Sequence, residues 1–490
     1  MGAPRLQPRP LYRPRDHTAS PLWQLLDRHF DEFERVYDDR FAGKYGFWRP
    51  QIRKSVDAYL KCGDLHEGFA RVRCPQCKHE MFVAYSCKQR CACPSCHQKR
   101  ALVTAMHVEE DVCASVPHRQ LVFTIPKRFR LYCRYDRKLL GRMTREAWLC
   151  VRQYVHEALG RKDAVPGMIA AMQTHGELLH FHPHIHALVT CGAFTEDGVF
   201  LDVPEFDEDR MLALWEDRIF KLLTKEDLVT EDVVGQMRSW DHTGFGFDQS
   251  VHLPAGDRKG IERLIQYMVR CPFSLSRILK VTDEGTVVYK SEKQQCRPFP
   301  DLKSPSLKQG TSRNFQILPV LDFLAEFTQH IPAKGAHLIR YSGWYSNKAR
   351  GMRNKTIAAD APANGEEDTD AKKACRQRWA MLIQRIYEVD PMACPQCSTQ
   401  MKVVAFIDPP QEEIIQKILK HCAPHPAPRP PGSSSLRSCG SDLRPSLGFG
   451  CGLWEEPPER APPDLDGFTE DPDEAVEIEY VDIDTFLAEF

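Results

Sequence analysis

The residues best suited to chemistry are histidines at alternating positions in the run His-Phe-His-Pro-His-Ile-His, which ends at His186. Side chains alternate between the two faces of a β-strand, so His184 and His186 point the same way while Ile185 points into the core. Two imidazoles on one strand face can share a divalent cation. We therefore predict a metal site at His184 and His186, which His182 joins if Pro183 leaves the strand straight.

The third ligand of such an ion is open. The segment Gln173-Thr-His175 supplies one if it pairs as the neighbouring strand. The alternative interpretation is a set of surface histidines, or of core histidines that are satisfied by hydrogen bonds.

A candidate nucleophile, Tyr267, lies in the basic segment Leu-Ile-Gln-Tyr-Met-Val-Arg that ends at Arg270. Residues three apart on a helix share a face. The Arg270 cation can there orient the phenol, stabilise a phenolate or hold a phosphate. On composition alone, an ordinary tyrosine of an amphipathic helix is the better interpretation. Tyr341 and Tyr345, in a segment predicted to be a loop, are reserve nucleophiles.

Clustered cysteines point to zinc. The nineteen cysteines follow no apolar leader, so metal binding is favoured over a disulfide framework. Cys74, Cys77, Cys93 and Cys96 form two Cys-x2-Cys pairs, and we predict that they share one tetrahedral, structural Zn(II). Several neighbours leave a second site open, although each alone favours a structural role: Cys62, His66, Cys87, Cys91 and His97.

A third pair, Cys394 and Cys397, lies far along the chain. It forms a candidate second zinc site with Cys422 and with His421 or His425. The spacing is loose, and simple turn cysteines fit equally well.

The bulk composition fits a globular protein with a basic body. Hydrophobic residues make up 42% and charged residues 27% of the 490 residues, and no apolar run is long enough to span a membrane. The net charge of −1 conceals an asymmetry, because the segment 453–490 holds 14 acidic residues and one basic residue. Residues 1–452 carry 65 Lys+Arg against 53 Asp+Glu, which favours a phosphate-rich partner.

Hydrophobic periodicity places these residues on a mixture of helices and strands. It predicts helices over 17–60, 139–159, 260–270 and 376–389, and strands over 120–125, 168–173 and 184–190. Residues 355–375 read as a polar linker, and residues 423–490 as a Pro-rich, acidic and largely disordered tail. The pattern indicates an α+β catalytic domain.

The motifs, taken in order, resemble one known family: the insertion-sequence ninety-one type transposases, members of the HUH (His-hydrophobic-His) nuclease superfamily. The resemblance covers roughly residues 20–420 and is strongest at His182-Pro-His-Ile-His-Ala-Leu-Val189. The other segments that carry it are Ser86-Cys-Lys-Gln-Arg90 with the 93–96 pair, Val116–Lys127, Tyr267–Ser274, His330-Ile-Pro, Arg340–Lys348 and Tyr387–Cys397.

The resemblance implies an HUH-type antiparallel sheet flanked by helices, with the histidine pair on a central strand and Tyr267 at the nucleophile position. Some relatives carry a second tyrosine four residues earlier, where this chain has Arg263. The chain therefore resembles a single-tyrosine version. We expect a helical and zinc-binding N-terminal domain over 17–100 with a zinc-ribbon-like module, the catalytic domain over 101–352, a helical Cys-pair segment over 376–422 and the tail over 423–490.

The expected activity is that of a rolling-circle transposase of the cytoplasm and nucleoid. It would cut and rejoin single-stranded DNA through a 5′-phosphotyrosine, with Mg(II) or Mn(II) on the histidines. No Gly-x4-Gly-Lys-Ser/Thr loop is present, so ATP is not expected. The expected DNA contacts are Lys88, Arg90, Lys99, Arg100 and Lys127.

Three alternatives stay open. A zinc-dependent DNA-binding regulator would use the same cysteines and basic surface without catalysis. A replication initiator or relaxase would share the chemistry but serve another element. An inactivated relative would account for the unusual tail.

Overall fold

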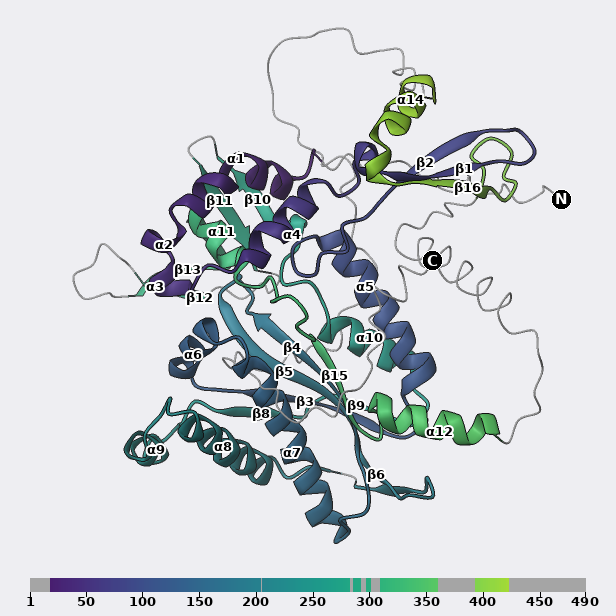
Figure 1. Cartoon of the computed structure of the whole chain (residues 1–490). Coiled ribbons are helices and arrows are strands. Elements are labelled where there is room, and N and C mark those ends of the chain that lie inside the picture. The colour runs from purple at the N-terminus through teal and green to yellow at the C-terminus, as the bar shows by residue number, and fades with distance from the viewer. Residues whose placement is uncertain are drawn as a thin grey trace, which may run out of the picture. The chain divides into compact units, whose positions relative to one another are not determined.

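The computed structural model describes residues 18–203, 205–282, 285–291, 297–300, 309–359 and 393–422. The chain divides into two compact units (Figure 1). The smaller unit contains residues 63–85 and, from the far end of the chain, residues 393–422. The larger unit contains the other described residues.

An antiparallel sheet of six strands forms the centre of the larger unit. Its strand order is β15-β4-β5-β3-β8, and β9 also pairs with β3. The strands are β3 (His118–Thr124), β4 (Gly167–His175), β5 (Phe181–Thr190), β8 (Gly246–Asp248), β9 (His252–Leu253) and β15 (Ile339–Gly343).

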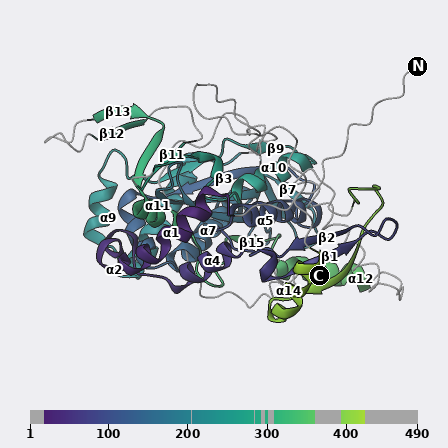
Figure 2. The ribbon, with the colours of Figure 1, turned by 90° about the horizontal axis from the view of Figure 1, so that it is seen from above.

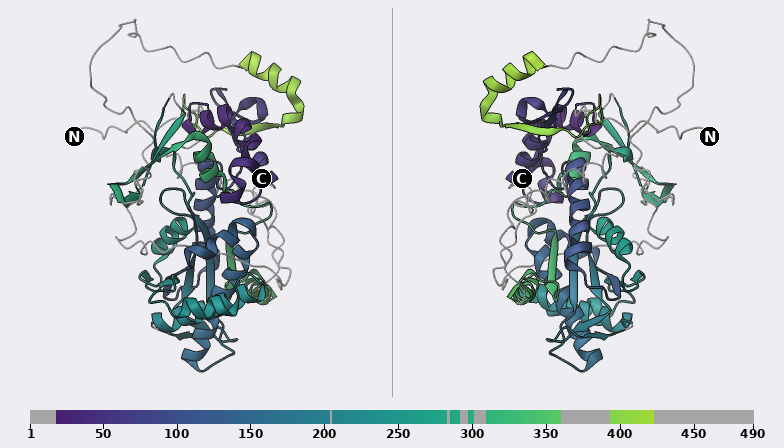
Figure 3. Two further views of the ribbon diagram at one scale, coloured as in Figure 1. Left: turned by 90° about the vertical axis from the view of Figure 1, so that its left-hand side faces the viewer. Right: turned by 90° about the vertical axis from the view of Figure 1, so that its right-hand side faces the viewer.

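Side-chain alternation gives this sheet two different faces. Along β5, Ile185, Ala187 and Val189 are fully buried against α7 (Leu139–Leu159) and α8 (Glu208–Lys225). Leu188 faces the other way and packs with residues of α5 (Pro94–His107) and α10 (Arg258–Met268). Figure 1 labels these helices, and the side views in Figure 3 show helices on both sides of the strands.

An aromatic helical cluster occupies the N-terminal part of this unit. It contains α1 (Pro21–Arg35), α2 (Tyr37–Arg40), α3 (Ala42–Tyr45) and α4 (Pro50–Leu60). Buried residues such as Leu26, Phe30 and Phe33 recur at helical spacing on α1 and pack with α11 (Val320–Thr328). A small sheet, β10 (Ile278–Val281), β11 (Thr286–Lys290) and β14 (Phe315–Pro319), joins this core.

Several further helices and strands complete the described part of the larger unit. The hairpin β12–β13 extends at the edge of the ribbon in Figure 2. The bounds of these elements are α6 (Arg130–Tyr135), β6 (Gly192–Phe194), β7 (Phe200–Asp202), α9 (Glu231–Arg238), β12 (Arg297–Pro300), β13 (Gln309–Arg313) and α12 (Asn347–Ala359).

In its described residues, the smaller unit is a three-stranded antiparallel sheet of order β16-β1-β2 with one α-helix. Its elements are β1 (Phe69–Arg73), β2 (Glu80–Ala84), β16 (Lys402–Ile407) and α14 (Glu412–Cys422). Phe69, Phe82, Ile407 and Ile415 form one small core. Because β1 pairs with β16, the predicted contiguous domain over 17–100 is wrong: residues 63–85 fold with residues 393–422.

The predicted mixture of helices and antiparallel strands is confirmed, including the helix over 139–159. The predicted strand over 184–190 begins earlier, at Phe181, and the helix over 260–270 ends earlier, at Met268. The linker predicted from 355 begins inside α12. The predicted helix over 376–389 and the predicted tail lie outside the described residues. No helix in the described ranges is long and apolar enough to cross a bilayer.

Because the core behind the sheet is closely packed, truncating one of its side chains should destabilise the fold strongly. Ile219 on α8 is fully buried in the cluster behind β5. We expect Ile219→Ala to lower the free energy of unfolding by about 2–5 kcal/mol, because truncation leaves a cavity in close-packed surroundings. Urea unfolding measures this change. Val199→Ala, at a side chain that is 58% exposed, is the control and should shift the free energy by less than about 0.5 kcal/mol; equal effects would refute the packing assignment.

Candidate active site and metal clusters

The histidine run lies on β5 between β4 and β3, where two-residue alternation gathers its rings on one face. The strand continues through Pro183. The ring centroids of His182 and His184 are 5.2 Å apart, and those of His184 and His186 are 4.6 Å apart. His186 is fully buried and His182 is nearly so. The sequence therefore placed all three histidines correctly on one side of one strand.

Hydrogen bonds orient the two central rings. Nδ1 of His184 donates to the backbone carbonyl of His182 at 2.9 Å, which leaves the lone pair on Nε2. The side-chain amide of Gln120 lies 2.7 Å from Nδ1 of His186, and turning that amide end for end lets Nδ1–H donate to its oxygen. Nε2 of His186 is buried and has no hydrogen-bond partner within the described residues. An unsatisfied buried imidazole nitrogen is a suitable metal ligand.

The surroundings keep these imidazoles neutral, which is the state that binds metal. Burial, together with the charge of the nearby Arg270, lowers the pKa of His184 to about 4. Burial, followed by the charges of His184 and Arg270, places the pKa of His186 well below its usual range.

The neighbouring strand supplies candidates for a third ligand. Gln173 of β4 lies directly opposite His184, as the predicted pairing requires. His175 is buried, and neither ring nitrogen has a hydrogen-bond partner within the described residues. The histidines do not close around one point: among the described residues, three or more metal-ligating atoms from His, Cys, Asp or Glu come within 4.8 Å of one another only in two cysteine clusters.

Tyr267 lies on α10, the helix that packs on the histidine face of the sheet. Its ring centroid is 5.4 Å from that of His186, and the Arg270 guanidinium carbon is 4.8 Å from its ring centroid. Arg270 is not on the helix, contrary to the predicted span, because α10 ends at Met268 ahead of Pro272. The turn nevertheless brings the cation over the phenol ring.

Two side chains fix the C-terminal end of α10. The Gln173 amide donates to the carbonyls of Tyr267 and Met268, both at 2.9 Å. His97 of α5 accepts from the Cys91 amide through Nδ1 and, through Nε2–H, donates to the carbonyl of Val269 at 2.8 Å. His97 is therefore a structural residue that joins the Cys93–Cys96 knuckle to the tyrosine helix. The sequence alone could not show this long-range contact.

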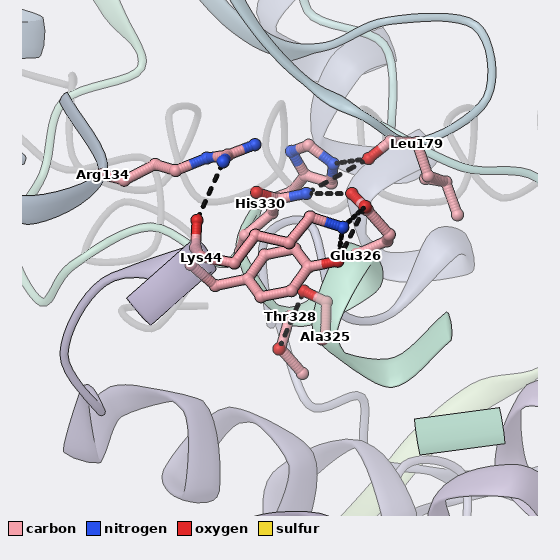
Figure 4. Close-up of polar contacts among 9 residues, drawn as sticks. Lys44, Arg134, Leu179, Ala325, Glu326, Thr328 and His330 are labelled. Atoms are coloured by element: carbon pink, nitrogen blue, oxygen red, sulfur yellow. Dashed lines mark hydrogen bonds and ion pairs between the residues drawn. The ribbon is translucent and has the colours of Figure 1, made fainter. Parts of the chain in front are cut away.

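His330 holds the turn that leads into β5 (Figure 4). Its Nε2–H donates to the carbonyl of Leu179 at 2.9 Å, and Thr174 donates to its Nδ1 at 3.0 Å. Leu179 has a φ of +63°, an unfavourable conformation for a leucine, so the contact stabilises a strained turn. The nearby carboxylate of Glu326 accepts from Tyr45 at 2.8 Å, which ties α11 to α3.

Of the two reserve tyrosines, Tyr345 lies in the predicted loop, the turn between β15 and α12, and Tyr341 does not. Tyr341 lies on β15, opposite Ile169 of β4. Tyr345 is fully buried, and its hydroxyl lies 2.7 Å from Nε2 of His118. Burial raises the pKa of Tyr345 well above its usual range, so this hydroxyl is a core group and not an accessible nucleophile.

The first cysteine cluster differs from the predicted set. Cys93 and Cys96 gather with Cys62 and Cys87, at Sγ–Sγ distances of 3.7 to 3.8 Å. Four thiolates around zinc, each about 2.3 Å from the metal, lie about 3.8 Å apart at the corners of a tetrahedron. The donor set and spacing therefore fit structural Zn(II), with residues that the sequence had left as optional neighbours.

Cys74 and Cys77 belong elsewhere, so the predicted single site of four knuckle cysteines is wrong. They gather with Cys394 and Cys397 in the smaller unit. The pairing of β1 with β16 brings these segments together, and no local spacing reveals such a pairing. The side chains of His421 and Cys422, and all of His425, lie outside the described residues.

The predicted DNA contacts have different exposures. Lys88 and Lys127 are exposed. Arg90 is half-buried and donates to the carbonyl of Ala336 at 2.6 Å. Lys99 and Arg100 are half-buried on α5, and burial lowers the pKa of Lys99.

Two family models match the chain. The one described as "Transposase zinc-binding domain" matches residues 28–125, and the one described as "Putative transposase" matches residues 167–353. The first span contains the Cys62–Cys96 cluster, and the second contains the histidine strand and Tyr267.

Two curated proteins are similar over most of the chain. "Transposase for insertion sequence element IS801" of Pseudomonas savastanoi pv. phaseolicola is 25% identical over 368 residues, which cover 72% of this chain and 83% of that protein. "Putative transposase y4qJ" of Sinorhizobium fredii (strain NBRC 101917 / NGR234) is 22% identical over 408 residues, which cover 76% of this chain and 94% of that protein. No solved structure matches the chain significantly.

The buried, neutral histidines predict acid sensitivity. Burial lowers the pKa of His330 to about 3, against about 6.5 in an unfolded chain. Below pH 6.5 the unfolded state therefore binds more protons, and stability is lost as the pH falls toward 3. We expect His330→Gln, which keeps a donor for Leu179, to reduce the slope of unfolding free energy against pH by up to about 1.4 kcal/mol per pH unit between pH 6 and 5. Urea titrations at each pH measure the slope; an unchanged slope would show that His330 is not a buried neutral group.

Proposed function

The chain belongs to the insertion-sequence ninety-one type transposase family, and from this premise we propose that it cuts and rejoins one DNA strand through a phosphotyrosine at Tyr267. The observation that carries the proposal is the contact of Tyr267 with the histidine strand, 5.4 Å between its ring centroid and that of His186. A core tyrosine far from the histidines would give no reason to assign chemistry to either. The proposed place of action is the cytoplasm, at the nucleoid.

His184 and His186 are the proposed ligands of a divalent ion. In His184, Nδ1 is hydrogen-bonded to the His182 carbonyl, and in His186, Nδ1 is hydrogen-bonded to the Gln120 amide. In both rings Nε2 is therefore the nitrogen that can bind the ion. His182 and a group from β4, Gln173 or His175, are the candidates to complete the set. A bound Mg(II) or Mn(II) supplies Lewis-acid polarisation of the scissile phosphate.

The protein's own groups account for the covalent step. The Tyr267 phenol loses its proton to solvent, and its oxygen attacks phosphorus. The bond from phosphorus to the 3′-oxygen of the flanking nucleotide breaks, and that oxygen takes up a proton as a 3′-hydroxyl. Arg270, whose guanidinium lies over the phenol ring, stabilises the phenolate and the phosphate charge.

The phosphotyrosine conserves the energy of the broken bond. Attack by a second 3′-hydroxyl on the phosphorus rejoins DNA and restores the phenol, so no ATP is consumed. Arg263 stands one turn before Tyr267, where a second nucleophile would lie on the same helix face. Cutting and joining therefore alternate on one tyrosine, and the substrate is single-stranded or locally melted DNA.

The first test is covalent capture. Full-length protein is incubated with a labelled single-stranded oligonucleotide from the ends of its own element and with Mg(II) or Mn(II), then run on a denaturing gel. We expect a metal-dependent protein–DNA band that Tyr267→Phe lowers by at least about 10³-fold, because it removes the nucleophile. The double substitution of His184 and His186 by Ala should lower it by about 10²–10³-fold, the scale of lost charge stabilisation.

Tyr341→Phe is the matched control, because it removes a phenol from the same unit and should keep the band. Loss of the band with Tyr341→Phe but not with Tyr267→Phe would overturn the assignment of the nucleophile. Binding of the same oligonucleotide by wild type without any band would favour a zinc-dependent DNA-binding protein.

DNA binding should depend on the exposed lysines Lys88 and Lys127. Each phosphate contact releases about 0.7 counterions from single-stranded DNA, so Lys88→Ala and Lys127→Ala should each flatten the plot of log affinity against log salt by about 0.7. Fluorescence anisotropy at several salt concentrations measures the slope. Lys225→Ala, at an exposed lysine on α8 behind the sheet, is the control and should leave the slope unchanged; the same change for all three variants would contradict a localised DNA path.

A further inference from the structure

The smaller unit contains a short duplication that its two halves bring together. Residues 74–81 read Cys-Pro-Gln-Cys-Lys-His-Glu-Met, and residues 394–401 read Cys-Pro-Gln-Cys-Ser-Thr-Gln-Met. Both copies share the pattern Cys-Pro-Gln-Cys-x3-Met. The matched family models end at residue 125 and residue 353, so neither covers the second copy.

The two copies have the same backbone conformation. The residue after each second cysteine, Lys78 or Ser398, has a positive φ, +64° and +58°. In each copy the amide of that residue donates to the carbonyl of the first cysteine, at 3.2 Å for Lys78 and 2.8 Å for Ser398. The amide of each first cysteine donates to the carbonyl five residues later, at 2.8 Å for Cys74 and 2.9 Å for Cys394. Each copy is therefore a tight turn that presents two thiols to one side, as zinc knuckles do.

Strand pairing places the turns face to face. β1 leads into the first turn and β16 leaves the second, and Arg73 pairs with Lys402 at the end of the ladder nearest both. Sγ of Cys77 lies 3.4 Å from that of Cys394, and Sγ of Cys74 lies 3.5 Å from that of Cys397. All four sulfur atoms lie within 4.8 Å of one another. These distances approach the edge of a zinc–thiolate tetrahedron, about 3.8 Å, and exceed the disulfide bond length of about 2.05 Å.

The packing around the thiols is apolar. Cys74 and Cys394 are buried with Val72 and Met401, while Cys77 and Cys397 lie at the surface. Met81 packs against the same cluster, so the duplicated methionines cover the thiols from both turns. Such a small core gives little independent stability, and small domains of this kind depend on a metal.

We propose that Cys74, Cys77, Cys394 and Cys397 bind a second structural Zn(II), which closes a zinc ribbon built from two segments more than 300 residues apart. Soft thiolates in a closed tetrahedral set select zinc over Mg(II) or Mn(II). The site is separate from the Cys62–Cys87–Cys93–Cys96 cluster and does not depend on the proposed DNA chemistry. Its role is to join the segment after residue 392 to the N-terminal part of the chain.

Zinc content of the full-length protein tests the proposal. Wild type should carry two zinc ions per chain by elemental mass spectrometry. The double substitution of Cys394 and Cys397 by Ser should leave one, and so should the double substitution of Cys93 and Cys96 by Ser. Cys113→Ser, at a cysteine outside both clusters, should leave two.

Two substitutions at Cys397 distinguish a zinc ligand from a residue that only packs. Cys397→His keeps a zinc-binding side chain at an exposed position and should retain two zinc ions, whereas Cys397→Ser should lose the second ion to a mild chelator. Limited proteolysis should then cut within residues 393–422 in Cys397→Ser but not in Cys397→His. One zinc ion in wild type, equal behaviour of the two Cys397 variants, or disulfides among the four cysteines in the purified protein would overturn the proposal.

Discussion

The alternation of side chains along β5 is the constraint on which the rest of the larger unit depends. Ile185 and every second residue from it pack into the core against α7 and α8. The residues between them face α10, the helix that carries Tyr267. A shift of one residue in the pairing of β5 would turn the imidazoles into the core against α7 and α8 and turn the aliphatic side chains toward α10. The burial of Ile185 therefore fixes the direction of His184 and His186, and the stability of the sheet positions the candidate site.

Placing histidines on a strand is not sufficient, because the proposed nucleophile, Tyr267, lies on a separate element, α10. The end of α10 is held from two directions, by the Gln173 amide on the sheet side and by His97 on the side of α5. His97 follows directly after Cys96, so a metal in the first cluster would stiffen the start of α5 and, through this hydrogen bond, the turn that carries Arg270. The zinc-binding and transposase regions are thus mechanically joined inside one unit.

Local periodicity and motif spacing were sufficient to predict the secondary structure around the candidate site. The helix over 139–159, the strand at 184–190 and the common face of the histidines follow from rules about neighbours within a few residues. The cysteine partners could not be predicted in that way, because Cys62 and Cys394 reach their clusters through tertiary packing. The repeated Cys-Pro-Gln-Cys-x3-Met was visible in the sequence and is the signal that links Cys74 to Cys394. The spacing between the Cys74–Cys77 pair and the Cys93–Cys96 pair had instead suggested that these four cysteines share one zinc ion.

Loop closure explains why a metal suits the smaller unit. Cys77 and Cys394 are 317 residues apart, and closing a loop of that length in an unfolded chain costs about 5–6 kcal/mol. The small apolar cores around Phe69 and Val72 must offset that entropy with little buried area. Structural zinc contributes about 10–16 kcal/mol of apparent binding free energy when its ligands fold around it. Because this exceeds the closure cost, four thiolates can hold the two segments together even though the intervening chain folds as a separate unit.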